Sequence, residues 1–202
     1  MGMTCTLRRV NETDLRRLRE APPEQVFTFI YGESIPLETV REPGLSGFIM
    51  RLFGIQTQQV SATAAANEFQ QINDTDELDI DKAWHGLHFL FTGTADNGQE
   101  PGCFLLCGGE EIGEEDVGPA RVLRADQVSQ FAAFLAELSN EELLRRYNPT
   151  RMSALEIYPE IWTRPEAPGE SSFDYLLEAF EDLRDFVTTT SARGDALIVS
   201  IV

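Results

Sequence analysis

The sequence predicts a single α+β domain over residues 1–202, in which a small mixed sheet holds strands from both chain ends and several helices cover it. Three observations predict this fold. Segment 196–202 is β-branched and almost wholly apolar, which is typical of a strand buried on both faces in mid-sheet. Segment 171–187 repeats apolar residues at helical spacing. With 202 residues, 42% of them hydrophobic, the chain can bury about 70% of the surface that its unfolded form exposes, without a disulfide or metal.

The first third of the chain predicts one strand and then short helices. Residues 3–10 predict the strand, and Asn11 follows it as a helix cap. Pro22 and Pro23 end that helix and begin another. A third apolar segment covers 45–53, whereas residues 56–71 are rich in Gln, Ala, Ser and Thr and predict a loop with at most a marginal helix.

The middle of the chain predicts a buried helix over 81–92, capped by Asp81 and ended by Gly93. Segment 103–107 is short and apolar, so its pattern fits a strand and a helix equally well. Residues 118–123 predict a strand, and an amphipathic helix around Phe131 follows it.

The last third predicts three helices before the final strand. Ser139 begins one of them, and the pair Asn148–Pro149 interrupts and restarts the helical run. The final helix begins with a capping box at Ser171 and ends at Gly194. Its outer face, opposite the apolar stripe, carries four acidic residues: Glu178, Glu181, Asp182 and Asp185.

The charge balance is strongly negative and restricts the partners. Asp and Glu number 34 against 16 Lys and Arg, which gives a net charge of −18. Nucleic acids and anionic lipids bind through Lys and Arg, so we expect neither nucleic acid nor a membrane surface as partner. A basic protein or a metal ion would suit this surface, but so would simple solubility, since net charge keeps proteins apart.

The cysteines and the chain ends predict a cytoplasmic protein. No charged segment followed by an apolar core opens the sequence as in a signal peptide, and no apolar run approaches the ~20 residues that span a bilayer. The three cysteines, Cys5, Cys103 and Cys107, cannot all pair within one chain, and reduced core thiols fit the cytoplasm. No histidine or further cysteine is close enough in sequence to complete a zinc site, so we predict no metal and no cofactor.

Two histidines, His85 and His88, form the first candidate site. Residues three apart share a helix face, so both imidazoles can point the same way, as metal ligands or as an acid–base residue and its neighbour. Asp81 is the nearest carboxylate, and no H-E-x-x-H signature is present. The alternative is structural: His88 packs in the apolar stripe, and His85 bonds to Asp81 or to a carbonyl.

The second candidate is the acidic glycine-rich segment 108–116, GGEEIGEED. A Gly-Gly pair permits a tight turn, after which Glu110 and Glu111 are available as a general base, metal ligands or a docking point for a cation. The segment lacks the lysine of a phosphate loop. A solvated acidic loop is the alternative.

Tyr158 and Trp162 flank Pro159 in the segment 156–162, where they wall a pocket or fill a seam. Residues 74–81 are acidic but lack the glycine and glutamate that a calcium loop needs at the required spacing. Nucleophile elbows, C-x-x-C pairs and dinucleotide fingerprints are absent from the sequence. The pocket hypothesis therefore joins eight residues: Asp81, Trp84, His85, His88, Glu110, Glu111, Tyr158 and Trp162.

Three motifs, taken in order, resemble the YfbM-like family of bacterial proteins: DKAWHGLHFLFTG (81–93), GGEEIG with the following GPARVL (108–123), and EIYPEIW (156–162). The two chain ends resemble that family as well, so the similarity covers nearly the whole chain, apart from 56–71. The family is classed as a domain of unknown function, so the resemblance implies one α+β domain and no activity. The matching positions are Asp81, Lys82, Trp84, His85, Gly86, His88, Gly108, Gly109, Glu110, Tyr158 and Trp162.

Two functions follow from these observations. The favoured one is a non-catalytic domain whose acidic surface binds a basic protein, as an inhibitor or immunity-type factor does. The alternative is an enzyme that binds a small molecule or a metal in a pocket formed by the two histidines and the Gly-Gly-Glu-Glu segment.

Overall fold

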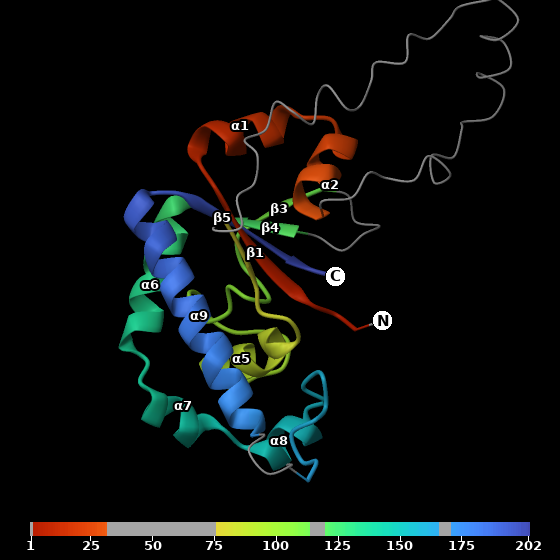
Figure 1. The fold of residues 1–202 in the computed structure, drawn as a ribbon, viewed down its shortest axis with the longest axis vertical. Helices are drawn as coiled ribbons and strands as arrows, with labels where there is room; N and C mark the ends of the chain where they lie inside the picture. The colour runs from red at the N-terminus through yellow and green to blue at the C-terminus, as the bar shows by residue number, and fades with distance from the viewer. Residues whose placement is uncertain (1, 32–75, 114–119, 166–170) are drawn as a thin grey trace, which may run out of the picture.

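The computed structural model describes residues 2–31, 76–113, 120–165 and 171–202 (Figure 1). Its centre is a five-stranded sheet with the order β2-β1-β5-β4-β3. The strands are β1 Cys5–Val10, β2 Glu77–Asp79, β3 Glu110–Ile112, β4 Ala120–Leu123 and β5 Ala196–Ile201. As predicted, both chain ends supply strands and the last one lies in mid-sheet.

The two terminal strands form the longest pairing of the sheet. β1 runs antiparallel to β5 in a register that places Leu7 opposite Val199, and the backbones of Thr4 and Val202 extend the ladder. β5 is buried along almost its whole length, as its β-branched sequence predicts. The expected mixture of parallel and antiparallel pairs does not occur, because each pairing among the described strands is antiparallel.

Helices cover both faces of the sheet (Figure 1). On one face lie α1 Glu12–Glu20 and α2 Pro23–Tyr31, which enclose a small core with Leu15, Phe29 and Ile198. On the other face lie α5 Ala83–Thr92, α6 Ala125–Glu137 and α9 Ser172–Arg193, which enclose the main core with Leu87, Phe131 and Phe180. The helices α7 Asn140–Arg146 and α8 Pro149–Ala154 connect α6 with the segment before α9.

Local capping explains six of the described helix ends, and most of these six were predicted. The side chains of Asn11, Ser139, Asn148 and Ser171 accept hydrogen bonds from first-turn N–H groups of α1, α7, α8 and α9. The residues that end α5 and α9, Gly93 and Gly194, have φ angles of 74° and 73°, where a side chain would be strained.

Three local predictions need correction. The position before α5 is occupied by Lys82, and α5 begins at Ala83, because Asp81 has a φ of 45° and cannot belong to the helix. Segment 103–107 is neither strand nor helix but a series of hydrogen-bonded turns. The acidic segments 74–81 and 108–116 each contain a short strand, β2 and β3. The predictions for Gly32, 45–53 and 56–71 lie outside the described residues.

Candidate functional site

The two histidines lie on α5, and both point toward the turn that follows that helix. Gly93 ends α5 and reverses the chain, so the carbonyl groups of Ala95 and Asn97 come back beside the helix. His85 lies 2.7 Å from the first of these oxygens and His88 lies 3.1 Å from the second, measured from Nε2. The two imidazoles therefore share one side of α5, as their spacing predicts, and both bond to backbone carbonyls of the following turn.

His85 uses both of its ring nitrogens within the chain. Nε2 donates to the Ala95 carbonyl, and Nδ1 accepts the backbone N–H of Tyr158 at 3.0 Å. This pair of bonds requires the neutral ring with its proton on Nε2. Burial lowers the pKa of His85, although the Ala95 carbonyl and Asp96 act in the opposite direction. A ring held neutral by two backbone groups has no nitrogen left for proton transfer.

His88 is fully buried and is also neutral. Its pKa is lowered to about 4, chiefly by burial; His85 and Arg121 also lower the pKa, whereas the hydrogen bond to the Asn97 carbonyl and the Asp96 charge raise it. Its Nδ1 has no hydrogen-bond partner among the described residues, so this atom is an unsatisfied acceptor. The environment is the main core, which fits the structural reading of His88.

Aromatic rings form a stack beside His85. The centroids of the Trp84 and His85 rings lie 4.8 Å apart at an interplanar angle of 7°. The centroids of the Trp84 and Tyr158 rings lie 6.0 Å apart. Trp84 donates its indole N–H to the Met3 carbonyl, and Trp162 donates its own to the Ile157 carbonyl. Both indoles are buried, so these residues act as packing groups with satisfied donors.

Gly86 permits the close packing of α5 against its neighbours. A Cβ atom at this position would lie 2.7 Å from Trp162 Cη2 and 2.7 Å from a methyl group of Leu176. Since Leu176 belongs to α9, this contact joins three segments that are remote in sequence. The motif glycine therefore has a steric role.

Asp81 lies at the edge of this cluster, where it binds Tyr175 of α9. The Tyr175 hydroxyl donates to Asp81 Oδ2 at 3.2 Å and accepts the Lys82 backbone N–H at 3.1 Å. Burial raises the pKa of Tyr175, and the Asp81 carboxylate raises it further. Tyr175 was not predicted, because its partners lie more than 90 positions away and no local motif marks them.

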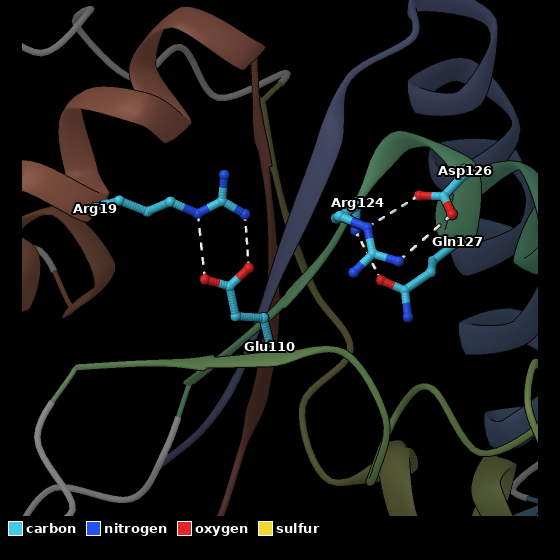
Figure 2. Close-up of polar contacts among 5 residues, drawn as sticks. All are labelled: Arg19, Glu110, Arg124, Asp126 and Gln127. Carbon is cyan, nitrogen blue, oxygen red and sulfur yellow. Dashed lines mark hydrogen bonds and ion pairs between the residues drawn. The ribbon is translucent and has the colours of Figure 1, made fainter.

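Glu110 and Glu111 lie on the edge strand β3. Glu110 forms a two-pronged ion pair with Arg19 of α1, at 2.6 and 3.2 Å (Figure 2). Glu111 is exposed and lies opposite Arg121 in the register with β4. Within the described residues, no hydrogen bond or ion pair joins either carboxylate to the histidine cluster. Of the eight residues in the pocket hypothesis, several of those on and beside α5 contact one another, whereas Glu110 and Glu111 form no hydrogen bond or ion pair with them among the described residues.

The outer face of α9 is the other polar surface that the sequence singles out. Asp174, Glu178, Glu181, Asp182 and Asp185 are all exposed. Their spacing places them on one side of the helix, opposite the buried Leu176, Phe180 and Leu183. None of the five takes part in an ion pair between described residues. We call these five residues the α9 acidic face.

Residues 2–31, 76–113, 120–165 and 171–202 contain no group of three or more His, Cys, Asp or Glu placed to hold a metal ion. None of the helices in these ranges has the length and apolar character needed to cross a membrane.

The comparisons with known proteins agree with the resemblance found in the sequence. The family described as "Domain of unknown function (DUF1877)" matches residues 1–200. The chain is also similar to the crystal structure of YfbM from Escherichia coli, a protein of unknown function, with a TM-score of 0.54 and 18% sequence identity. That match covers 98% of this chain and 99% of the other. No curated protein matches the chain. At this identity the structural match shows a shared fold alone.

Proposed function

Because the chain belongs to the DUF1877 family, a domain of unknown function, we propose a role from the chemistry of its surface: it is a non-catalytic domain that binds a basic protein. The α9 acidic face is the surface we assign to this partner. An inhibitor or immunity-type factor, which blocks a basic protein by covering its cationic surface, would act in this way.

The observation that supports this proposal is that the α9 acidic face forms no ion pair with another described residue; Glu181 accepts one hydrogen bond, from the Asn140 side-chain amide at 3.3 Å. Asp174 and Asp185 are eleven residues apart, so the five carboxylates extend over about 17 Å of helix at 1.5 Å per residue. Arg184 is the only basic residue between them in sequence, and its guanidinium lies over the Phe180 ring at 5.1 Å. The five carboxylates are therefore exposed, and none of them forms an ion pair with a described residue of α9.

Several arginines elsewhere in the described chain are already paired with other carboxylates. Arg19 binds Glu110, Arg8 binds Glu77, and Arg145 and Arg146 both bind Glu142. Adjacent like charges on a helix destabilise it by about 0.2–0.5 kcal/mol per pair, so the acidic face has an energetic cost in the free protein. A basic partner would remove that cost when it binds.

Electrostatic attraction of this kind has a defined signature. It raises the rate of association and weakens as salt screens charges beyond the Debye length of about 8–10 Å. A partner held by the α9 acidic face should therefore dissociate at high salt. Conservative substitutions near the start of α5, whose side chains are bonded within the chain, should leave the affinity for this partner unchanged.

The test is capture of partners by the tagged full-length protein from its own cell lysate at low and at high salt. We expect a stoichiometric basic protein that is retained at low salt and lost at high salt. A His85→Gln variant should capture it equally well, because His85 bonds to backbone. Capture that survives high salt, or that the His85→Gln variant loses while remaining folded, would contradict the proposal.

A further inference from the structure

The three cysteines of the chain surround one buried arginine. Arg121 of β4 is 7% exposed and donates to the carbonyl oxygens of Phe104, Leu105 and Gly108, at 3.2, 2.7 and 3.4 Å. Burial raises the pKa of the Cys5 thiol, and the charge of Arg121 partly offsets that rise. Burial lowers the pKa of Arg121, and the thiols of Cys103 and Cys107 partly offset that fall. Within the described ranges no carboxylate forms an ion pair with Arg121.

Cys103 and Cys107 lie at the two ends of one turn. The Cys107 N–H donates to the Cys103 carbonyl at 2.8 Å, which is the bonding pattern of one α-helical turn. Such a turn separates the Cα atoms of its end residues by about 6 Å, within the roughly 4.4–6.8 Å that a disulfide spans. It separates their Cβ atoms by about 5–6 Å, so the two side chains move toward each other to reach the roughly 3.5–4.5 Å that the bond requires. The Cys103 thiol donates to the Cys107 carbonyl oxygen at 3.7 Å, which places its sulfur beside residue 107.

The two thiols differ in their access to solvent. Cys103 is 2% exposed, whereas Cys107 is half-buried. Burial raises the pKa of Cys103 to about 12 and that of Cys5 to about 12, so both remain protonated thiols at neutral pH. A soluble oxidant therefore reaches Cys107, the more exposed of the two thiols, first.

We propose that Cys103 and Cys107 are a redox modification site, in which a hydroperoxide converts the two thiols into a reversible intramolecular disulfide. The Cys107 thiolate attacks a peroxide oxygen, the O–O bond breaks, and the released oxygen anion takes a proton to leave as an alcohol or water. The resulting sulfenic acid is attacked by the Cys103 sulfur, which loses its proton as the S–S bond forms and water departs. Two electrons pass from the thiols to the hydroperoxide.

The test is treatment of the folded, full-length protein with hydrogen peroxide, followed by denaturation, alkylation of free thiols and tryptic digestion. Cleavage after Lys82 and Arg121 leaves both cysteines on the peptide 83–121, and cleavage after Arg8 separates Cys5 from them. We expect peptide 83–121 to lose two hydrogen atoms and both alkylation sites, and dithiothreitol to restore both. Cys5 should remain free.

Variants separate the steps. In Cys103→Ser the resolving thiol is absent, so Cys107 should accumulate as sulfinic acid, and in Cys107→Ser the thiol of Cys103 should stay reduced. A Cys5→Ser control should form the disulfide as the wild type does. Three results would overturn the proposal. The first is oxidation of Cys103 in the Cys107→Ser variant at the wild-type rate, and the second is a disulfide that includes Cys5. The third is two free thiols on peptide 83–121 after peroxide treatment.

Discussion

The start of α5 and the outer face of α9 are both rich in polar side chains, but they use them in opposite ways. Around α5, both nitrogens of His85, the indole N–H groups and the Tyr175 hydroxyl are bonded to the chain itself. On the α9 acidic face, five exposed carboxylates take part in no ion pair with another described residue. Groups that are satisfied internally hold the fold, and groups that are left to solvent remain available for a partner.

The largest effect should come from truncation of the aromatic stack. Trp84→Ala removes a buried indole that contacts His85 and Tyr158, and large-to-small changes of this kind destabilise by about 3–5 kcal/mol. Urea unfolding measures the loss. The control Leu144→Ala, at an exposed leucine, should change stability by less than about 0.5 kcal/mol. A stable Trp84→Ala protein that no longer binds its partner would instead make the stack a binding site.

The next effect is a pH dependence that originates at His88. Its pKa is about 4 in the folded protein and about 6.5 when unfolded, so the unfolded chain binds the proton more readily. The contribution to stability is complete above about pH 6.5 and falls by about 3 kcal/mol as the pH drops toward 4. Urea unfolding of the wild type and of His88→Gln between these pH values should show a steeper slope in the wild type, because His85, whose pKa burial also lowers, still contributes in the variant. Equal slopes would mean that His88 is accessible to protons in the folded state.

A smaller loss should follow the substitution Gly86→Ala. The added Cβ would lie 2.7 Å from Trp162 Cη2, and overpacking of this kind typically destabilises by about 1–3 kcal/mol. Thermal unfolding should show a lower Tm with binding of the partner unchanged. A neutral result would mean that the contact between α5, α9 and Trp162 is looser than this geometry implies.

The smallest effect has the opposite sign. Replacing Glu178, Glu181, Asp182 and Asp185 by their amides removes several like-charged neighbours, which should raise the free energy of unfolding by up to about 1 kcal/mol. Urea is the suitable denaturant because guanidinium salts would screen the charges. Added salt should reduce the gain. A loss of stability would show that these carboxylates have a structural role in the fold.

Much of the fold could be predicted from the sequence, because local signals determine helix ends and buried strands. Asn11 and Ser171 act as caps, Gly93 and Gly194 have the expected positive φ angles, and β5 lies in mid-sheet. The edge strands β2 and β3 were missed because they are short and contain charged residues. Ion pairs from Arg8 to Glu77 and from Arg19 to Glu110 connect them to β1 and α1, and such long-range pairs leave no local pattern.

The candidate site was predictable only within one helix. The spacing of His85 and His88 correctly indicated a shared face, but the groups they bond are the backbone carbonyls of Ala95 and Asn97. Because every residue has a backbone carbonyl group, no sequence pattern marks the carbonyls that a histidine will bond. The separation of Glu110 from the histidines is a property of sheet order, which no local motif specifies.

The most direct test of the account is a comparison of two variants that lose the same charge. One neutralises Glu178, Glu181, Asp182 and Asp185, and the other neutralises Glu12, Glu20, Glu111 and Asp126, which are also exposed. The affinity of the purified basic partner is measured for each by titration at low salt. Exposed charge pairs contribute about 0.2–1 kcal/mol each, so the loss of four should weaken binding of the first variant by about 0.8–4 kcal/mol, or roughly fourfold to a thousandfold, and the second should bind nearly as the wild type does. Equal weakening in both variants would contradict a specific α9 acidic face and leave only the net charge of the protein to explain binding.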